Sequence, residues 1–252
     1  MPDSFQLCIV IPCYNEEKRL NIARYSNFLN LHKHVLVCFV NDGSNDNTLQ
    51  VLTKIKSNFP NNVAAISMEK NSGKAETVRS GFKHCNATYD FEKIAYLDAD
   101  LATTLEECLE ISEHVNSEIV LAFGSRISKI DTTIDRKTVR HYIGRVVATL
   151  ISNQLKLPIY DTQCGCKIFD RELSKEVFLE KFISKWLFDV EIFHRIIKLH
   201  SNDQMRLIAR EIPLKSWIDY DDSKVKMTYF FKLWLDLYQI GKKYNTQKNN
   251  IS

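Results

Sequence analysis

The sequence lacks several features that would place it in a common class of protein. It has no apolar run near the roughly 18 residues that a membrane-spanning helix needs, and no basic segment followed by a cleavable apolar one at its start. We therefore expect residues 5–11 to form a first strand and not a signal segment. The formal net charge is only +3, so the overall charge gives no support for nucleic-acid binding.

Glycine and cysteine motifs for ligand binding are also missing. The pattern GxxxxGK[ST] does not occur, which excludes a P-loop. The 7 cysteines are scattered, and an odd number without a signal segment indicates reduced thiols in the cytosol. Cys164 and Cys166 form a CxC pair, which lacks the usual spacing of zinc ligands and has no histidine nearby. We therefore expect no zinc site.

Apolar runs alternate with helical patterns through the first half of the chain. The runs are apolar without polar–apolar alternation, as expected for parallel strands that helices cover on both faces. They comprise residues 5–11, 34–40, 62–68, 93–98 and 118–124, with helices expected from about residues 16, 45, 73 and 104. This order predicts an α/β fold with an open, mostly parallel central sheet, whose ligands bind beyond the carboxyl ends of the strands.

The second half of the chain is less regular. Helical spacing of apolar residues predicts an amphipathic helix over residues 140–155. Shorter signals predict strands at 166–170 and 205–213 with a helix over 187–200 between them. Residues 226–244 are apolar almost all round, which is typical of a helix that is buried or lies on a membrane surface.

Polar segments follow each of the first four strands. They are PCYNEE (12–17), NDGSNDNT (41–48), EKNSGKAET (69–77) and DADLATT (98–104). One polar loop at the end of a strand is ordinary, but four at the same edge of a sheet favour a binding site.

Asp98 and Asp100 close the fourth apolar run. Two carboxylates suit a divalent cation such as Mg²⁺, which takes few protein ligands and completes its shell with water and substrate phosphate. The alternative is a solvated strand end followed by a helix that Thr103 or Thr104 caps. A phosphatase of the haloacid dehalogenase type fits poorly, because Ala102 stands where its signature has Thr or Val and the pair is not on the first strand.

Two further segments carry polar groups suited to a nucleotide. Asp42 can accept hydrogen bonds from a nucleobase or a ribose, or can simply complete a turn before the next helix. Gly73 and Lys74 open a helix whose free N–H groups favour an anion.

In this order and spacing, IPCYNEE, NDGSNDNT, NSGKAETVRSGF and YLDADLATT resemble the nucleotide-binding half of glycosyltransferase family 2, the inverting enzymes with the GT-A fold. Further along, the chain resembles the polyprenyl-phosphate sugar synthases of this family, most closely their dolichyl-phosphate β-glucosyltransferase branch. The segments that carry this second resemblance are FGSR (123–126), DTQCGCKIFDR (161–171), KWLFDVE (185–191) and EIPLKSWIDYDDSKVK (211–226).

The resemblance implies a role for each matching residue. Near the nucleotide-sugar donor it places Pro12, Tyr14, Asn15, Glu16, Asp42, Gly73, Lys74, Asp98 and Asp100. Asp100 is implied as the main ligand of a catalytic Mg²⁺ or Mn²⁺, together with Asp98. A clamp for the acceptor phosphate is implied at Arg126, Arg140, Ser223 and Lys224. The sugar pocket is implied at Asp161, Thr162, Gln163, Asp189 and Glu191, where Asp161 and Asp189 are the candidate bases should catalysis need one.

Two positions depart from the family pattern. Asn41 stands where the motif usually has a first Asp, so a negative charge is lost beside Asp42. Ala102 stands where mannosyl-type synthases have Gln, which removes one possible metal ligand and disfavours mannose.

The resemblance also implies how the chain is organised. We expect a single domain over residues 1–240, with a nucleotide-sugar-binding half at 1–125, an acceptor-binding half at 126–240 and a disordered tail at 241–252. We expect neither the N-terminal membrane anchor nor the C-terminal transmembrane helices that are common among relatives, so the amphipathic helices at 140–155 and 226–240 would meet the lipid at a membrane surface. Burial against the sheet or in a homodimer is the alternative for them. We expect a cytoplasmic protein or one peripheral at the inner face of the membrane.

The implied activity is transfer of a hexose, with UDP-glucose the favoured donor, to a polyprenyl phosphate with inversion at the sugar carbon. A family 2 enzyme that glycosylates a sugar hydroxyl of a surface polysaccharide is the alternative, and it would need a true base. A sugar nucleotidyltransferase fits less well, because PCYNEE lacks the glycines that such enzymes carry after the first strand. A non-catalytic module that binds nucleotide sugars is disfavoured by the retained acids and basic residues.

Overall fold

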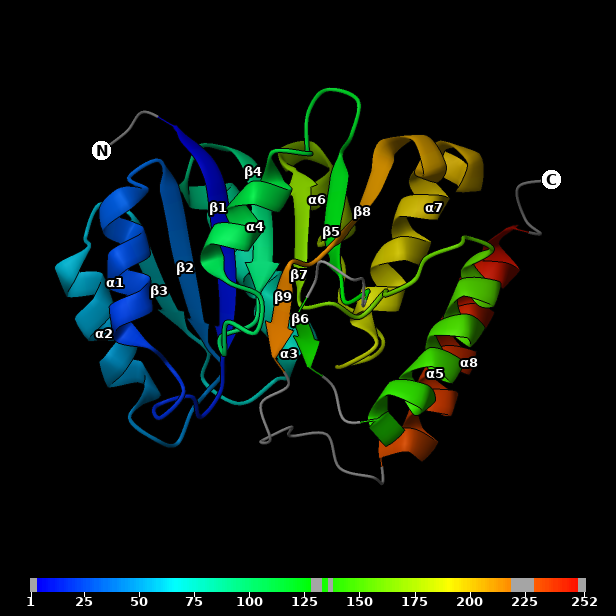
Figure 1. Cartoon of the computed structure of the whole chain (residues 1–252), viewed down its shortest axis with the longest axis horizontal. Helices are drawn as coiled ribbons and strands as arrows, with labels where there is room; N and C mark the ends of the chain where they lie inside the picture. Colours follow the sequence, from blue (N-terminus) through cyan, green and yellow to red (C-terminus); the bar gives the residue numbers. More distant parts are fainter. Residues whose placement is uncertain (1–3, 128–132, 136–137, 219–228, 249–252) are drawn as a thin grey trace.

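The computed structural model describes residues 4–127, 133–135, 138–218 and 229–248. Its centre is a seven-stranded sheet with the order β3-β2-β1-β4-β7-β5-β8 (Figure 1). These strands are β1 (Phe5–Cys13), β2 (Val35–Asn41), β3 (Val63–Ser67), β4 (Phe91–Leu97), β5 (Leu121–Ser125), β7 (Cys166–Asp170) and β8 (Ala209–Pro213). Two short strands, β6 (Thr133–Asp135) and β9 (Ser216–Ile218), form a separate parallel pair. The open α/β sheet predicted from the sequence is confirmed.

Parallel pairing dominates the sheet, with one interruption. The pairs β1–β2, β1–β4, β2–β3 and β5–β8 are parallel, whereas β7 runs antiparallel to both β4 and β5. The strand order reverses at β1, which has β2 on one side and β4 on the other. In open α/β sheets such a reversal leaves a crevice at the carboxyl ends of the strands, where ligands bind.

Helices cover both faces of the sheet, which explains why the strands are apolar without alternation. On β1, Cys8 and Val10 belong to one buried cluster, and Leu7, Ile9 and Ile11 belong to the other. The first cluster contains side chains of α3 (Lys74–Thr88), α5 (Thr138–Leu155), α6 (Arg171–Val177), α7 (Phe188–Ile208) and α8 (Tyr229–Lys248). The second contains side chains of α1 (Ile22–Leu31), α2 (Thr48–Asn58) and α4 (Leu105–Ser112).

Several helix boundaries differ from the sequence-based expectation. Helix α1 begins at Ile22 and not near residue 16, because Asn21 caps it by accepting from the Arg24 N–H at 3.1 Å. The strand predicted from residue 205 begins only at Ala209, because α7 continues to Ile208. Helix α8 runs to Lys248, so the tail predicted to be disordered from residue 241 is helical over most of its length.

Helices α5 and α8 lie side by side at one end of the molecule, opposite α1 and α2 (Figure 1). They touch where Gly241 faces Gln154: a Cβ at residue 241 would lie 3.1 Å from the Gln154 amide nitrogen. None of the helices in the described ranges is long and apolar enough to cross a membrane.

Gly81 offers a test of how closely α3 packs on the sheet. A Cβ at this position would lie 2.4 Å from Val10 and 2.8 Å from Val40, so a methyl group cannot fit without movement. We expect Gly81→Ala to lower the free energy of unfolding by about 1–3 kcal/mol, as overpacked cores do. Lys83→Ala on the exposed side of α3 is the control and should have little effect. Urea denaturation of both variants measures the difference, and equal stabilities would contradict the packing argument.

Candidate functional site

The loops after β1 and β2 are bonded to each other. The Asn15 backbone N–H donates to the Ser44 hydroxyl at 3.0 Å, and the Glu16 N–H donates to the Thr48 hydroxyl at 2.8 Å. Asn15 has a positive φ of 52°, a conformation in which asparagine is well tolerated. Pro12 lies within β1 opposite Val40, and the next residues, which include Tyr14, follow at the same edge. The predicted residues 12–16 therefore border one shared edge of the sheet.

Asp42 joins the loop after β2 to the start of α3. Its carboxylate accepts from the backbone N–H groups of Ser72 at 2.7 Å and Gly73 at 2.9 Å. The side chain is almost fully buried, with 3% exposed. A contact of Asp42 with a base or ribose stays a prediction; the role visible in the structure is to hold Gly73, and thereby Lys74, in place.

Asp98 and Asp100 each form an ion pair with a cation from another segment, Asp98 with the first residue of α3 and Asp100 with the loop after β1. The Lys74 ammonium lies 2.5 Å from an Asp98 carboxylate oxygen, and an Arg19 guanidinium nitrogen lies 2.9 Å from Asp100. The chain turns directly after β4, where the Leu101 N–H donates to the Asp98 carbonyl at 3.1 Å and Leu101 has a φ of 52°. Both acids thus face the strand-end edge together with two cations.

The helix cap proposed as the alternative to a metal site is also present. The Thr104 hydroxyl accepts from the Glu107 N–H at 3.1 Å and caps α4. Because Thr104 does this, neither acid is needed as the cap of α4. The two readings of the segment are therefore compatible.

The electrostatics of the pair suit a further cation. Burial and the neighbouring Asp98 carboxylate raise the pKa of Asp100, against the lowering effects of the Ala102 N–H, Arg19 and Lys74. For Lys74, burial lowers the pKa, but the carboxylates of Asp98 and Asp189 outweigh it and raise the pKa overall. A cation that binds between the two carboxylates reduces their mutual repulsion and so favours the charged form of Asp100.

Asp98 and Asp100 can supply only part of the coordination shell of a divalent metal, so water and the phosphate of a bound substrate would have to complete it. Among the described residues no group of three or more His, Cys, Asp or Glu side chains could hold a metal ion. Asp98 and Asp100 supply carboxylate oxygens, which Mg²⁺ and Mn²⁺ prefer, and such ions complete their shell with water and phosphate oxygens. The backbone leaves room for Asp98 at Gly165, where a Cβ would come within 2.0 Å of its carboxylate oxygen.

Arg126 and Asp161 form a second ion pair at the end of β5. The Arg126 Nε and Nη2 atoms donate to the two Asp161 oxygens at 2.6 and 2.8 Å, and the Arg126 backbone N–H adds a third bond at 3.1 Å. Burial lowers the pKa of the Arg126 guanidinium, but the Asp161 carboxylate reverses this and raises it. Arg126 also lies over the Trp217 ring at 5.2 Å. The predicted phosphate clamp and the predicted base are therefore direct partners.

The segment after Asp161 is held by backbone hydrogen bonds. The Asp161 N–H donates to Glu211 at 2.8 Å, and the Gln163 N–H donates to the Asp161 carboxylate at 3.2 Å. Thr162 is buried, and its hydroxyl has no hydrogen-bond partner within the described part of the chain; the same is true of the Ser125 hydroxyl. Buried hydroxyls without a partner are uncommon in proteins.

Asp189, one of the two candidate bases, lies in a buried ion pair. It is 4% exposed and accepts from the Lys167 ammonium at 2.6 Å and from the Tyr96 hydroxyl. Lys167 is itself fully buried and donates to the Cys164 carbonyl at 2.8 Å. Asp189 is thus paired with a buried lysine, and its assignment as a candidate base stays a prediction.

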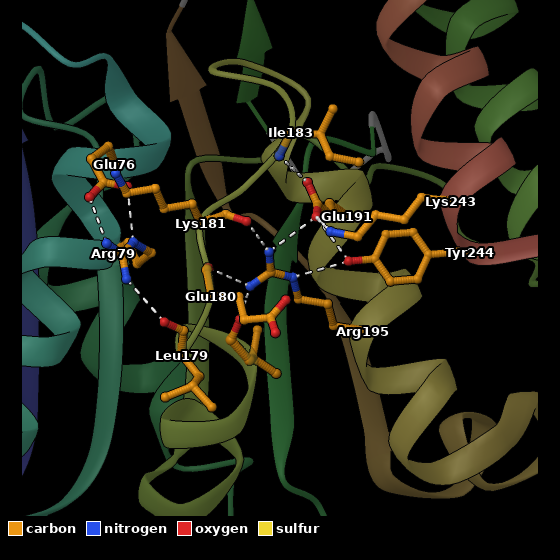
Figure 2. Close-up of polar contacts among 11 residues, drawn as sticks. Glu76, Arg79, Leu179, Glu180, Lys181, Ile183, Glu191, Arg195, Lys243 and Tyr244 are labelled. Carbon is orange, nitrogen blue, oxygen red and sulfur yellow. Dashed lines mark hydrogen bonds and ion pairs between the residues drawn. The ribbon is translucent and has the colours of Figure 1, made fainter. Parts of the chain in front are cut away.

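Glu191, predicted for the sugar pocket, lies in a buried network of hydrogen bonds, and its place in that pocket stays a prediction. It is fully buried and accepts from the Ile183 N–H at 2.7 Å, the Tyr244 hydroxyl at 2.9 Å and Arg195 at 3.1 Å. Figure 2 shows these donors converging on it from the loop before α7, from α7 and from α8. Its role in the structure is to connect these three segments.

Three predicted acceptor residues cannot be placed. The backbone of Arg140 belongs to α5, but its side chain lies outside the described residues, as do Ser223 and Lys224. Arg19, in contrast, was not predicted. Its only signal in the sequence is its place in the polar loop after β1, three residues beyond Glu16.

Comparison with known proteins gives close and consistent matches. The dolichyl-phosphate beta-glucosyltransferase of Saccharomyces cerevisiae is 30% identical over 243 residues, which cover 88% of this chain and 69% of the yeast protein. The Trichomonas vaginalis dolichyl-phosphate beta-glucosyltransferase ALG5C is 29% identical over 254 residues, which cover 95% of this chain and 72% of that protein.

A solved structure and a family model agree with these relatives. Glucosyl-3-phosphoglycerate synthase of Mycobacterium tuberculosis, in complex with Mn²⁺, UDP and phosphoglyceric acid, has a TM-score of 0.66 at 13% identity, covering 94% of this chain and 78% of that one. This likeness confirms the GT-A fold. The model described as "Glycosyl transferase family 2" matches residues 8–178. The chain therefore belongs to glycosyltransferase family 2 and is a glycosyltransferase.

Proposed function

We propose that this enzyme transfers a glucosyl unit from a nucleotide sugar, with UDP-glucose favoured, to a polyprenyl phosphate of the dolichyl type, with inversion at the sugar carbon. The names of the relatives support the acceptor and the sugar. The observation that carries the proposal is the row of three cation–carboxylate pairs, Lys74–Asp98, Arg19–Asp100 and Arg126–Asp161. Lys74 opens α3, while Arg19, the two acids Asp98 and Asp100, and Arg126 follow β1, β4 and β5 respectively. Asp161 lies in the segment between α5 and β7.

The donor would bind at the first two pairs. Asp100 and Asp98 would hold a Mg²⁺ or Mn²⁺ ion, which supplies positive charge to the diphosphate as it leaves; the M. tuberculosis structure contains Mn²⁺ with UDP. Lys74 and Arg19, now paired with the acids, are close enough to contribute charge to the same diphosphate. The site would then stabilise the charge that develops on the leaving group.

The acceptor phosphate would bind at Arg126. The guanidinium offers a planar set of donors that matches a phosphate, and the buried hydroxyls of Ser125 and Thr162 adjoin the pair in sequence. An oxygen of the phosphate attacks the anomeric carbon, the bond from that carbon to the donor diphosphate breaks, and its electron pair leaves with the nucleotide. A phosphate oxygen that is already ionised has no proton to lose, so this step requires no base.

Glycosylation of a sugar hydroxyl is less well supported. It would require a base to take the hydroxyl proton, and Asp189 is buried against Lys167. Asp161 is the remaining candidate, and it is paired with Arg126. The relatives also favour a phosphate acceptor.

The enzyme would meet its lipid at the end formed by α5 and α8. Helix α8 exposes Trp234, Leu235 and Tyr238 by 52–68%, and α5 exposes Val146 by 59%. Lys232 and Lys242 are also exposed on α8. Their positive charges would favour binding to a surface of anionic lipids. We propose peripheral binding at the cytoplasmic face of a membrane, with residues 1–125 serving the donor and 126–240 the acceptor.

Asp100→Asn tests the donor site. Loss of one negative charge weakens the cation site and should lower the rate of glucosyl transfer by at least about 100-fold, the size of effect seen when one electrostatic contact to a transition state is removed. Glu106→Gln, an exposed acid in the first turn of α4, is the control and should retain activity. The assay supplies UDP-glucose, Mn²⁺ or Mg²⁺ and a short polyprenyl phosphate, with mass spectrometry of the lipid product. A variant as fast as the wild type would refute the metal role.

Arg126→Gln tests the acceptor site. Loss of the charged donors should raise KM for polyprenyl phosphate about 10- to 100-fold and leave KM for the donor nearly unchanged. Arg210→Gln on β8, an exposed arginine that bonds only to local carbonyls among the described contacts, should change neither value. If Arg126→Gln instead reduced activity equally with acceptors that carry no phosphate, the phosphate role of Arg126 would be wrong.

The double variant Trp234→Ser, Leu235→Ser tests membrane contact. Two large apolar side chains are lost, so binding to vesicles that contain an anionic phospholipid should weaken at least about tenfold. Leu31→Ser on α1 is the control, because Leu31 is 77% exposed at the opposite end of the molecule. Vesicle co-sedimentation measures the binding, and size-exclusion chromatography of the same variants detects a homodimer. Unchanged sedimentation with a shift from dimer to monomer would assign this face to self-association.

A further inference from the structure

The loop between α6 and α7, residues 178–187, lies against the start of α3. The Ala75 N–H donates to the Lys185 carbonyl at 3.3 Å. The Lys185 side chain covers Gly73, where a Cβ would lie 2.9 Å from the Lys185 Cδ. Deeper along α3, Arg79 donates to the Leu179 carbonyl at 3.0 Å. This loop, which we call the α6–α7 loop, therefore adjoins the backbone that positions Lys74.

Arg195 of α7 fixes the α6–α7 loop through hydrogen bonds to its backbone carbonyls. Its guanidinium donates to the carbonyls of Val177 at 2.6 Å, Glu180 at 2.9 Å and Lys181 at 2.8 Å, and it lies over the Phe182 ring at 4.0 Å. Figure 2 shows Arg195 surrounded by these carbonyls, with Arg79 and Glu76 of α3 on the other side of the loop. Two arginines, Arg79 and Arg195, thus donate to the carbonyls of Leu179, Glu180 and Lys181 in the first part of this loop.

Helix α8 completes this support. The Tyr244 hydroxyl donates to Glu191 at 2.9 Å and lies 3.3 Å from the Arg195 Nε, while Glu191 accepts from the Ile183 N–H in the loop. A second connection joins Asp236 of α8 to the Ser184 hydroxyl at 2.5 Å. Ser184 in turn accepts from the Leu187 N–H at 2.9 Å, next to the first turn of α7.

These connections are buried, so each is hard to replace. Ser184 is 2% exposed, Asp236 is 7% and Glu191 is fully buried. Removing a hydrogen-bond donor from a buried carboxylate costs free energy, because the carboxylate is left without a partner. A shift of the surrounding chain can lower that cost. These contacts join α8 to the α6–α7 loop, and Lys185 joins that loop to Gly73 and Ala75.

We infer that the α6–α7 loop forms a wall of the donor site and that Tyr244, Asp236 and Ser184 are positioning residues for the nucleotide-sugar donor. The inference rests on the proposed function, since it takes Lys74 to lie at the donor diphosphate. Helix α8 is thereby a component of the donor site without contacting the donor. Its outer residues serve the lipid surface and its inner residues hold the loop.

Tyr244→Phe and Ser184→Ala test the inference with minimal change in volume. Each removes one hydroxyl, so the dissociation constant of UDP or GDP, measured by calorimetry with Mn²⁺, should rise about two- to tenfold. KM for the donor should rise in the same proportion, and KM for polyprenyl phosphate should stay constant. In hydrogen exchange, the amides of Ala75 and Ile183 should lose protection even without nucleotide.

Matched controls separate this effect from a general loss of stability. Tyr89→Phe removes a tyrosine hydroxyl from the far end of α3, and Ser57→Ala removes a serine hydroxyl that bonds within α2. Neither should alter nucleotide binding. Wild-type protein that binds neither UDP nor GDP would refute the proposed function and this inference with it. Wild-type binding that Tyr244→Phe and Ser184→Ala both leave intact, with unchanged exchange at Ala75, would refute the inference alone.

Discussion

Two carboxylates one residue apart at the end of a strand disfavour each other's ionisation, so keeping both charged requires compensation from cations, hydrogen-bond donors or water. In this protein Lys74 and Arg19 meet that requirement for Asp98 and Asp100. Much of the surrounding structure serves to bring the two cations there. Asp42 fixes the turn that places Lys74, the turns after β1 place Arg19, and Gly165 leaves the space that Asp98 occupies.

Cations are paired with carboxylates in the second half of the chain as well. Arg126 is matched by Asp161, and the fully buried Lys167 is matched by Asp189. Isolated buried charges would be costly, whereas paired ones with satisfied hydrogen bonds are tolerated. The two kinds of pair differ in exposure: Asp98 and Asp100 keep 39% and 26% of their side chains exposed, while Lys167 and Asp189 keep 0% and 6%. An exposed pair can exchange a partner for a ligand more easily than a buried one, which agrees with the proposed role of Asp98 and Asp100 at the donor.

The sequence predicted the order of strands and helices well, because burial on both faces leaves a plain signal in runs such as 5–11 and 34–40. The sequence did not predict that β7 is antiparallel, since a buried strand has the same apolar pattern in either direction. Among the predicted site residues, Lys74 pairs with Asp98 and Arg126 pairs with Asp161, and their roles in catalysis stay predictions. The burial of Asp189 and Glu191 was not predicted, because their partners Lys167 and Tyr244 are 22 and 53 residues away in sequence and a motif does not show which acid is buried.

The antiparallel strand β7 has a consequence for how the chain folds. It fills the gap between β4 and β5, so the sheet stays in two pieces until residues 166–170 are available. On the ribosome, strands β1 to β4 can pair as soon as they emerge, whereas β5 must wait for both β7 and the still later β8. Such non-local pairing is slow and leaves apolar strand edges exposed in the meantime. The donor side of the sheet is therefore expected to assemble first, and β5 is the part of the nascent chain most in need of protection from aggregation.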